Sequence, residues 1–357
     1  MKICFISKTF NNVGGIEKIT CDLANSLSQK KFNANVLQLE RKIHPYYSFN
    51  EEVKLSSLKC KENKKIYVLI KLFFFLNFHR INRLVIQNMN LGYISILRKF
   101  KLVRTKIIFV DHSSLNYYLS NNIQNEITKR IKYTKHADMV VALTSDNQRS
   151  YTEKLELPKS KVVCIPNFTN LVANGNYYSE SSTTIIAIGR LDKQKRFDLL
   201  LDAFSIVNKI NQNWNLEIYG EGKERSSLQE KIDKLNLSKV VFLKGNYNSI
   251  NEAMNNKSFL VASSEFEGFG IMLLEGLAFG MPLVSFDCYS GPSEMIKNGF
   301  NGYLANKLDV KDLADKICNM IANKELRSKM SQNAKLVYQN FEKEYVVQKW
   351  IDMFSNF

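Results

Sequence analysis

The densest group of residues able to do chemistry lies between Ser263 and Ser285, in the sequence SSEFEGFGIMLLEGLAFGMPLVS. It holds two carboxylates, Glu267 and Glu275, eight positions apart with glycines between them. The apolar run that starts after Gly270 predicts a helix, whose first backbone amides lack intrahelical partners and can bind a phosphate. Carboxylates accept hydrogen bonds from sugar and ribose hydroxyls. The stretch therefore predicts a site for a ligand with both groups, such as a nucleotide sugar.

A second stretch, residues 188–196, places Arg190 and Lys195 in one loop after a predicted strand. A guanidinium binds two phosphate oxygens as a fork, whereas an ammonium acts as a point charge. Both side chains can therefore reach a diphosphate. A solvated basic loop is the alternative interpretation, and it suits Lys193 and Arg196 better.

Two further strand ends carry candidate ligand contacts. Gly14 and Gly15 allow close backbone approach to a phosphate at the start of a predicted helix, although such a pair also serves simply as a turn. The segment from Lys244 to Tyr247 follows another predicted strand, and it either lines a base pocket or forms a structural turn.

The elements that must position these residues alternate between strand and helix along the whole chain. This pattern predicts an α/β fold with parallel sheets covered by helices. The length of 357 residues favours two domains. The expected boundaries are 1–166 for an N-terminal domain, 167–182 for a linker and 183–340 for a C-terminal domain, with a helix over 341–357 joining the first domain.

The net charge of +16 is unevenly distributed. Residues 1–180 hold 28 Lys and Arg against 13 Asp and Glu, whereas the remainder holds 22 against 21. The basic half suits an anionic lipid surface or a phosphorylated partner, or it is a generic solvated surface. Basic and aromatic residues do not interleave as in nucleic-acid-binding proteins, so no nucleic acid is expected.

Residues 66–78 are strongly apolar, with three consecutive phenylalanines at 73–75 and lysines or arginines on both sides. Thirteen residues are too few to span a bilayer. The segment is expected either to lie buried against the first sheet or to rest in a membrane interface.

The six cysteines show no Cys-x-x-Cys pair, and the N-terminus reads as a strand instead of a signal peptide, so a cytoplasmic protein is expected.

Four strings together resemble the retaining glycosyltransferases of family 4. They are Gly189-Arg190 with Lys195, Glu267-Gly-Phe-Gly with Glu275, Gly280-Met-Pro282, and the run Gly291-Pro-Ser-Glu-Met-Ile-Lys-Asn-Gly-Phe-Asn-Gly302. The resemblance covers essentially the whole chain and implies a GT-B fold, two facing Rossmann-like α/β domains around a cleft. The N-terminal domain would bind the acceptor and the C-terminal domain the donor. The run from Gly291 resembles the branch that uses UDP-hexoses or UDP-N-acetylhexosamines for bacterial lipopolysaccharide, capsule or lipid-linked glycans.

The resemblance also implies roles for individual residues. Arg190 and Lys195 would bind the donor diphosphate, and Glu275 the ribose hydroxyls. Glu267 would hold hydroxyls of the transferred sugar. The remaining assignments are the Gly15 amide at the phosphate, His112 as an active-site histidine, and the donor contacts Tyr247, Phe269, Gly270 and Ile271.

Retention in such enzymes is thought to proceed on one face of the sugar, with the departing phosphate helping to deprotonate the acceptor. The residues would then position the substrates and stabilise the leaving diphosphate. The chain contains no Asp-x-Asp sequence, so neither a bridging metal nor another cofactor is expected. The expected partners are a nucleotide sugar, a saccharide or lipid-linked saccharide, and an anionic membrane at its inner face. A UDP-sugar epimerase of the same fold is the main alternative.

Overall fold

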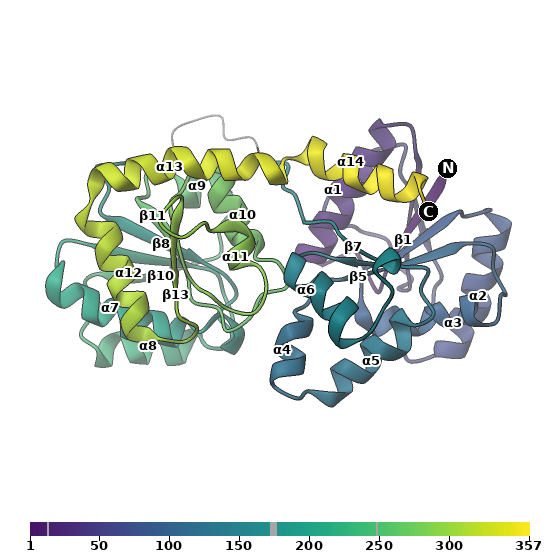
Figure 1. Ribbon diagram of the computed structural model, residues 1–357, viewed down its shortest axis with the longest axis horizontal. Coiled ribbons are helices and arrows are strands. Elements are labelled where there is room, and N and C mark those ends of the chain that lie inside the picture. Colours follow the sequence, from purple (N-terminus) through teal and green to yellow (C-terminus); the bar gives the residue numbers. More distant parts are fainter. Residues whose placement is uncertain (13, 172–176, 248) are drawn as a thin grey trace. The chain divides into compact units, whose positions relative to one another are not determined.

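The computed structural model describes residues 1–12, 14–171, 177–247 and 249–357 (Figure 1). The chain forms two compact units. The first comprises Met1–Phe168 together with Lys343–Phe357, and the second comprises Thr169–Glu342. Residues 172–176 of the expected linker lie outside the described residues.

The first unit is built on a parallel sheet of seven strands, ordered β3-β2-β1-β4-β5-β6-β7. The strands are β1 Lys2–Ser7, β2 Asn33–Gln38, β3 Lys54–Ser57, β4 Arg83–Ile86, β5 Lys106–Asp111, β6 Met139–Ala142 and β7 Val162–Cys164. Their buried residues are mostly Ile, Val, Leu and Phe, as expected for a parallel sheet covered on both faces.

Seven α-helices of the described residues belong to this unit. They are α1 Gly15–Gln29, α2 Lys65–Phe78, α3 Ile96–Lys99, α4 Leu115–Ser120, α5 Gln124–Thr134, α6 Ser145–Arg149 and α14 Lys343–Ser355. Helix α14 buries Val347, Trp350 and Phe354, and it packs beside α1. The guanidinium of Arg83, at the start of β4, donates a hydrogen bond of 3.2 Å to the carbonyl of Phe354. The C-terminal helix is therefore part of the first unit.

The second unit holds a parallel sheet of six strands, ordered β10-β9-β8-β11-β12-β13. The strands are β8 Thr184–Ile188, β9 Asn215–Tyr219, β10 Val241–Gly245, β11 Phe259–Ala262, β12 Leu283–Phe286 and β13 Gly302–Ala305. The helices are α7 Phe197–Ile210, α8 Arg225–Lys234, α9 Ile250–Met254, α10 Ile271–Ala278, α11 Pro292–Met295, α12 Val310–Ala322 and α13 Lys324–Tyr338.

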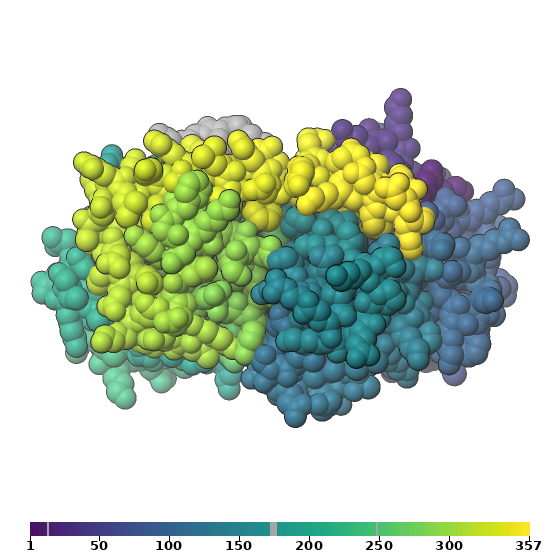
Figure 2. All heavy atoms as spheres, in the orientation of Figure 1, coloured from purple at the N-terminus to yellow at the C-terminus, as the bar shows by residue number. Residues whose placement is uncertain are grey.

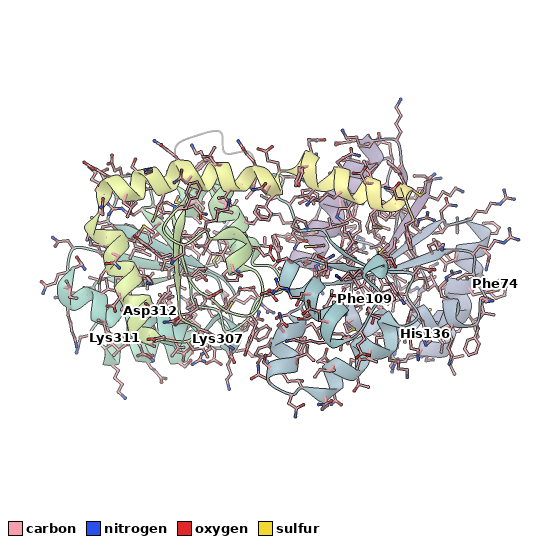
Figure 3. The ribbon with its side chains drawn as sticks, viewed as in Figure 1. Phe74, Phe109, His136, Lys307, Lys311 and Asp312 are labelled. Carbon is pink, nitrogen blue, oxygen red and sulfur yellow. The ribbon has the colours of Figure 1, made fainter. Side chains whose placement is uncertain are left out.

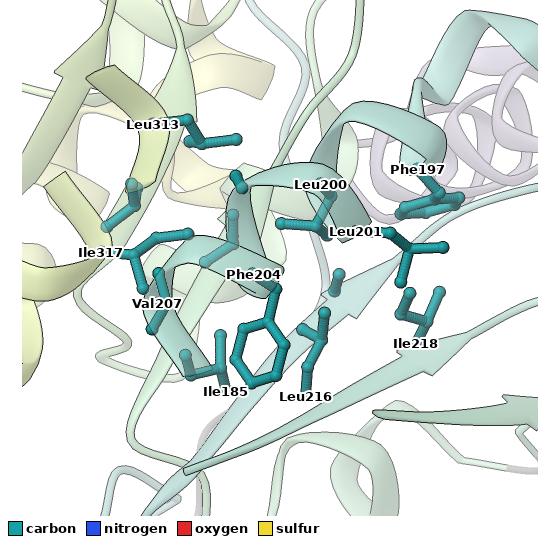
Figure 4. Packing of buried hydrophobic residues seen from close by; sticks show 14 of the residues in the cluster. Ile185, Phe197, Leu200, Leu201, Phe204, Val207, Leu216, Ile218, Leu313 and Ile317 are labelled. Atoms are coloured by element: carbon teal, nitrogen blue, oxygen red, sulfur yellow. The ribbon is translucent and has the colours of Figure 1, made fainter. Parts of the chain in front are cut away.

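The core of the second unit lies between its sheet and helices α7 and α12. Phe204 of α7 packs beside Ile185 and Leu216 of neighbouring strands, while Leu313 and Ile317 approach from α12 (Figure 4). Helices α12 and α13 form part of the outer surface of this unit (Figure 2). The two units thus have the predicted α/β class with parallel sheets, which confirms that prediction.

Several elements differ from the sequence expectations. The apolar pattern of the sequence predicts neither strands β3 and β13 nor helices α3, α4, α6 and α13. It also predicts a helix over 291–298, but α11 ends at Met295. The side chain of Asn301 accepts from the amide of Lys297 at 2.7 Å and donates to the carbonyl of Met295 at 2.9 Å. These bonds hold the chain in a turn after Met295.

Candidate active site

The strand order of each sheet identifies where a ligand is expected. In open parallel sheets the crevice lies outside the carboxyl ends of the strands, where the order reverses direction. In the second unit this point lies between β8 and β11. The loop after β8 carries Arg190 and Lys195, and the loop after β11 carries Glu267. The fold therefore places the two predicted donor-binding loops side by side.

A short ion pair joins these loops. The Nζ of Lys195 lies 2.6 Å from Oε1 of Glu267, and the two side chains are only 16% and 11% exposed. The hydroxyl of Ser264 donates to the same carboxylate oxygen at 2.6 Å. The Lys195 side chain runs across Gly189, where an added Cβ would lie 3.0 Å from Lys195 Cε. Gly189 directly follows β8, and because it has no Cβ it leaves space for the side chain of Lys195.

Three hydrogen bonds to backbone carbonyls connect the loop after β8 to the loop after β11. Ser263 donates its hydroxyl to the carbonyl of Lys195 at 2.7 Å, and the amide of Gln194 donates from Nε2 to the carbonyl of Phe266 at 3.0 Å. The backbone amide of Glu265 donates to the carbonyl of Gln194 at 2.9 Å. These three hydrogen bonds and the Lys195–Glu267 ion pair connect the two loops, so the positions of Lys195 and Glu267 are fixed before any ligand binds.

Helix α10 begins immediately after this loop. Its N-cap residue, Gly270, has a φ of 93°, which favours glycine. The side chain of Phe269 is buried, and its ring lies 5.8 Å from that of Phe341. The helix starts without a side-chain cap or an acidic residue in its first turn. Its first amides, beginning at Ile271, are therefore suited to an anion, and their contact with a phosphate stays a prediction.

Glu275 lies one turn inside α10 and is 6% exposed, among the buried Leu273, Leu274 and Leu277. The two glutamates are thus carried by one continuous segment, the loop after β11 and the helix that follows it. Glu267 contacts Lys195 directly, whereas Glu275 lies among the buried residues of α10.

Two predicted donor contacts lie further out. The side chain of Arg190 is 75% exposed, and its guanidinium pairs with Asp192 of the same loop at 3.1 Å. Tyr247 is 37% exposed, and its ring lies 6.3 Å from that of Tyr219 at the end of β9. Both lie at the carboxyl edge of the same sheet.

In the first unit, the glycine pair lies at the start of α1. Gly14 is the N-cap, and an added Cβ there would lie 2.1 Å from a carboxylate oxygen of Glu17. Burial raises the pKa of this carboxyl. Glu17 therefore lies over the helix start beside the predicted phosphate contact of Gly15, where it interacts favourably with the helix dipole.

His112 directly follows β5, and its Nε2 lies 2.6 Å from Oε1 of Gln87, the residue that follows β4. In this arrangement Nε2 carries the proton and Nδ1 is the acceptor. Burial lowers the pKa of His112 to about 4, against a smaller opposing effect of Asp111. The imidazole is therefore neutral at physiological pH.

A buried ionic network lies directly behind His112. The guanidinium of Arg130, fully buried, donates to both carboxylate oxygens of Asp111 at 2.8 and 3.1 Å. The hydroxyl of Tyr151 donates to the same carboxylate at 2.6 Å, and Glu126 pairs with Arg130 at 3.0 Å. Asp111 precedes His112 in the chain, so this network fixes the backbone that carries the histidine.

Sequence reasoning missed the residues that support the candidate site. They are Ser263, Ser264, Gln194, Gln87 and the pair Asp111–Arg130. A signal was available for Gln87, because it is a polar residue directly after a buried strand, at the carboxyl end where open parallel sheets bind ligands. No comparable signal distinguishes Ser264 from the other serines of the chain.

Within the described residues, no group of three or more His, Cys, Asp or Glu side chains lies close enough together to hold a metal ion. Among the described residues, no helix combines the length and apolar character that crossing a bilayer requires.

Comparison with known proteins gives two family matches. Residues 13–172 match the family model described as Glycosyltransferase Family 4. Residues 176–337 match the model described as Glycosyl transferases group 1. The two matches together span both units.

Curated relatives align over nearly the whole chain. The amylovoran biosynthesis glycosyltransferase AmsD of Erwinia amylovora is 26% identical, with 99% of each chain covered. A Campylobacter jejuni enzyme is also 26% identical, over 99% of this chain and 98% of that one. Its name is GalNAc-alpha-(1->4)-GalNAc-alpha-(1->3)-diNAcBac-PP-undecaprenol alpha-1,4-N-acetyl-D-galactosaminyltransferase. Among solved structures, a variant of TarM from Staphylococcus aureus, in complex with Fondaparinux, alpha-GlcNAc-glycerol and UDP, superposes with a TM-score of 0.83 at 16% identity, covering 99% of both chains.

Proposed function

The chain belongs to family 4 of the glycosyltransferases and has their GT-B fold, and on that premise we propose that it transfers a hexose or N-acetylhexosamine from a UDP-linked donor to a saccharide acceptor. The acceptor belongs to bacterial surface glycan synthesis: lipopolysaccharide, capsule or a lipid-linked saccharide. The observation that carries the proposal is the Lys195–Glu267 pair at the topological switch point of the second sheet.

The proposed donor site uses the groups that surround this pair. A diphosphate carries negative charge that Lys195, the exposed Arg190 and the first amides of α10 neutralise. Glu275 accepts hydrogen bonds from the ribose, and Glu267 from hydroxyls of the transferred sugar. Tyr247 lines the base end of the site. UDP is the nucleotide in the TarM complex, which supports UDP as the nucleotide here.

The proposed chemistry needs no protein nucleophile. The glycosidic bond to phosphate breaks as negative charge develops on the leaving diphosphate, and cations fixed beforehand stabilise that charge most effectively. The acceptor hydroxyl attacks the same face, and its proton passes to a departing phosphate oxygen. His112 is neutral because burial lowers its pKa to about 4, so it can orient hydroxyls by hydrogen bonds without adding a charge.

The direct test is a panel of UDP- and GDP-sugars assayed for transfer and hydrolysis, with the product anomer identified by NMR. The proposal expects one UDP-sugar to be consumed with release of UDP and retention of configuration. Conversion of the sugar nucleotide to an isomer without any acceptor would instead indicate the epimerase alternative. Consumption of no UDP-sugar would overturn the proposal.

A membrane location is proposed on the basis of helix α2. Val68, Leu72 and Leu76 of this helix are buried against the sheet. The opposite side exposes an apolar stripe of Ile66, Tyr67, Ile70, Phe74 and Phe78, and Figure 3 shows Phe74 on the outside of the first unit. The helix therefore has a buried side and an exposed apolar side, which supports the proposal that it both covers the sheet and contacts a membrane. Basic residues on both sides of the stripe favour an anionic membrane surface, at the inner face where a lipid-linked acceptor would be available.

A further inference from the structure

A cavity of about 810 Å³ lies within the first unit, away from any residue assigned above. Its walls come from the ends of four adjacent strands. Lys8 follows β1, Arg41 follows β2, Lys59 and Lys61 follow β3, and Asn90 lies in the turn after β4. Lysines of α2 and α5 close the remaining sides.

This location is where the fold itself favours a ligand. The order of the first sheet reverses between β1 and β4, and the cavity opens at the carboxyl ends of both strands. The packing around it is close: an added Cβ at Gly92, in the turn after β4, would lie 2.3 Å from the ring of the lining residue Tyr133. The segments that follow β1, β2, β3 and β4 therefore form most of the cavity wall.

The lining is strongly basic. It contains six cationic side chains against the two carboxylates Glu40 and Glu62. The cations are Lys8, Arg41, Lys59, Lys61, Lys65 and Lys129. Glu62 pairs with Lys8 at 3.5 Å, and Lys129 pairs with Glu126 outside the lining at 2.6 Å.

Arg41, Lys59, Lys61 and Lys65 form no ion pair within the described residues. Like charges gathered around one concavity repel one another, and a bound anion removes that repulsion.

The start of α2 adds to this positive character. Lys64 is its N-cap without a side-chain hydrogen bond, and the first turn contains no acidic residue. The positive end of the helix dipole is thus reinforced by Lys64 and Lys65 where an acidic residue would ordinarily offset it. This end of α2 borders the cavity through Lys65.

From these observations we propose that the cavity binds a phosphate or diphosphate group carried by the acceptor. The inference rests on the proposed transferase function and specifies its acceptor as an anionic, phosphate-bearing saccharide. Arg41 supplies a fork for two phosphate oxygens, and Lys59 and Lys61 supply point charges. The group would anchor the acceptor at the switch point of the first sheet, whose carboxyl edge also carries His112.

The shape of the surface favours this occupant over a lipid headgroup in the bilayer. The cations line a concavity, whereas the exposed apolar stripe of α2 contributes no residue to the cavity lining. In this proposal a membrane contacts the apolar stripe of α2, and a single phosphate group binds in the cavity.

Calorimetric titration with inorganic pyrophosphate tests the cavity directly, in the presence of saturating UDP to occupy a donor site. The pocket variant is Arg41→Gln/Lys61→Gln. The matched control is Lys54→Gln/Lys132→Gln, which removes two exposed lysines outside the lining. We expect the pocket variant to bind pyrophosphate at least tenfold more weakly, and the control to bind like the wild type, because only the pocket variant removes cations that would form charge-assisted hydrogen bonds to the phosphate oxygens.

Activity gives the second measurement. With a saccharide acceptor offered as its diphosphate ester and as its neutral methyl glycoside, the pocket variant should raise KM for the ester alone. The Lys54→Gln/Lys132→Gln control should leave both KM values, kcat and UDP-sugar hydrolysis unchanged. Failure of the wild type to consume any UDP-sugar would contradict the transferase function, while the pyrophosphate titration would still report on the cavity.

Three results would overturn the inference while leaving the transferase function standing. They are absence of pyrophosphate binding, equal binding by pocket and control variants, or equal KM values for ester and neutral glycoside. Prenyl-diphosphate and polyol-phosphate acceptors compared in the same assay identify the source of the phosphate. If phosphatidylglycerol vesicles displace pyrophosphate and the variant alters only vesicle binding, the cavity belongs to membrane recognition and the inference is wrong.

Discussion

The ammonium group of Lys195 lies 2.6 Å from the carboxylate of Glu267, although 72 residues separate them in the chain. The lysine belongs to the loop after β8 and the glutamate to the loop after β11, the two neighbouring strands between which the sheet order reverses. Their contact is thus a direct consequence of the topology. It brings together the two sequence motifs that carry the proposed donor site.

Replacing Lys195 by Ala is expected to lower kcat/KM for the UDP-sugar roughly 10²-fold or more, because preorganised charges at a leaving group contribute about that much. Lys193→Ala is the matched control, since Lys193 lies in the same short helical turn but is exposed. Steady-state kinetics, with circular dichroism to check folding, measures both. Equal activity of the two variants would remove Lys195 from the donor site.

Gly291→Ala is expected to weaken UDP binding at least tenfold, by displacing the loop before α10. Gly291 has a φ of 101°, and an added Cβ would lie 2.3 Å from the carbonyl oxygen of Phe269. The control is Gly299→Ala: its φ of 78° also disfavours alanine, but no atom lies within 4 Å of the added Cβ. That variant should lose about 1 kcal/mol of stability and keep its UDP affinity. Calorimetry with UDP separates the two cases.

The sequence predicted most strands because their buried runs are continuous, and it failed where that signal is absent. Strand β3 is an edge strand whose only large apolar residue, Leu55, is exposed. Strand β13 is an edge strand of the second sheet, and its two central residues are only partly buried. Each of these two strands contains too few buried apolar residues to differ from a loop, so hydrophobicity alone does not identify it.

Helix α13 was missed for a different reason. Its buried face includes Arg327 and Ser331, which interrupt the apolar stripe. Arg327 donates to the carbonyls of Met320 and Ile321 at 2.8 and 2.7 Å, and so satisfies the end of α12. A buried arginine that caps another helix has no signature in the sequence.

The functional residues also divide into those that the sequence identifies and those that it does not. Glu267, Glu275 and Lys195 were identifiable because a family motif carries them. The basic cavity of the first unit was not, since its lysines and arginine come from the loops after β1, β2 and β3 and from helices α2 and α5, which only the fold brings together.

His112 is expected to make folding stability fall as the pH decreases from about 6.5 towards 4. Burial lowers the pKa of its imidazole to about 4, so in this window the unfolded chain binds a proton that the folded chain does not. The contribution is complete above about pH 6.5 and reaches up to about 3 kcal/mol. In His112→Gln, the difference in unfolding free energy between pH 7 and pH 4.5 should shrink by about 2 kcal/mol. An unchanged difference, measured by urea denaturation, would mean that the histidine titrates normally.

Arg130→Met is expected to destabilise the first unit by about 3–5 kcal/mol, because it leaves the carboxylate of Asp111 buried without its cation. The control is Arg149→Ala, whose side chain is 63% exposed and lies 3.9 Å from Asp146. That change should stay within about 0.5 kcal/mol. Urea denaturation measures both, and a similar small effect of the two substitutions would contradict the structural role of the buried pair.

The apolar stripe of α2 is expected to bind anionic membranes. Phe74 and Phe78 are 64% and 83% exposed, so replacing both by Ser removes apolar area from the stripe without disturbing the buried Val68, Leu72 and Leu76. Flotation with phosphatidylglycerol vesicles at low salt should recover the wild type with the lipid and leave most of the Phe74→Ser/Phe78→Ser variant behind.

Ile210→Ser provides a control for this experiment, because Ile210 is 70% exposed but lies at the end of α7 in the second unit. Its flotation should match that of the wild type. High salt should weaken the binding of all three proteins, since the basic residues beside the stripe act through a screened electrostatic attraction. If the double variant floats as well as the wild type, α2 is not the membrane contact, and the exposed phenylalanines have another partner.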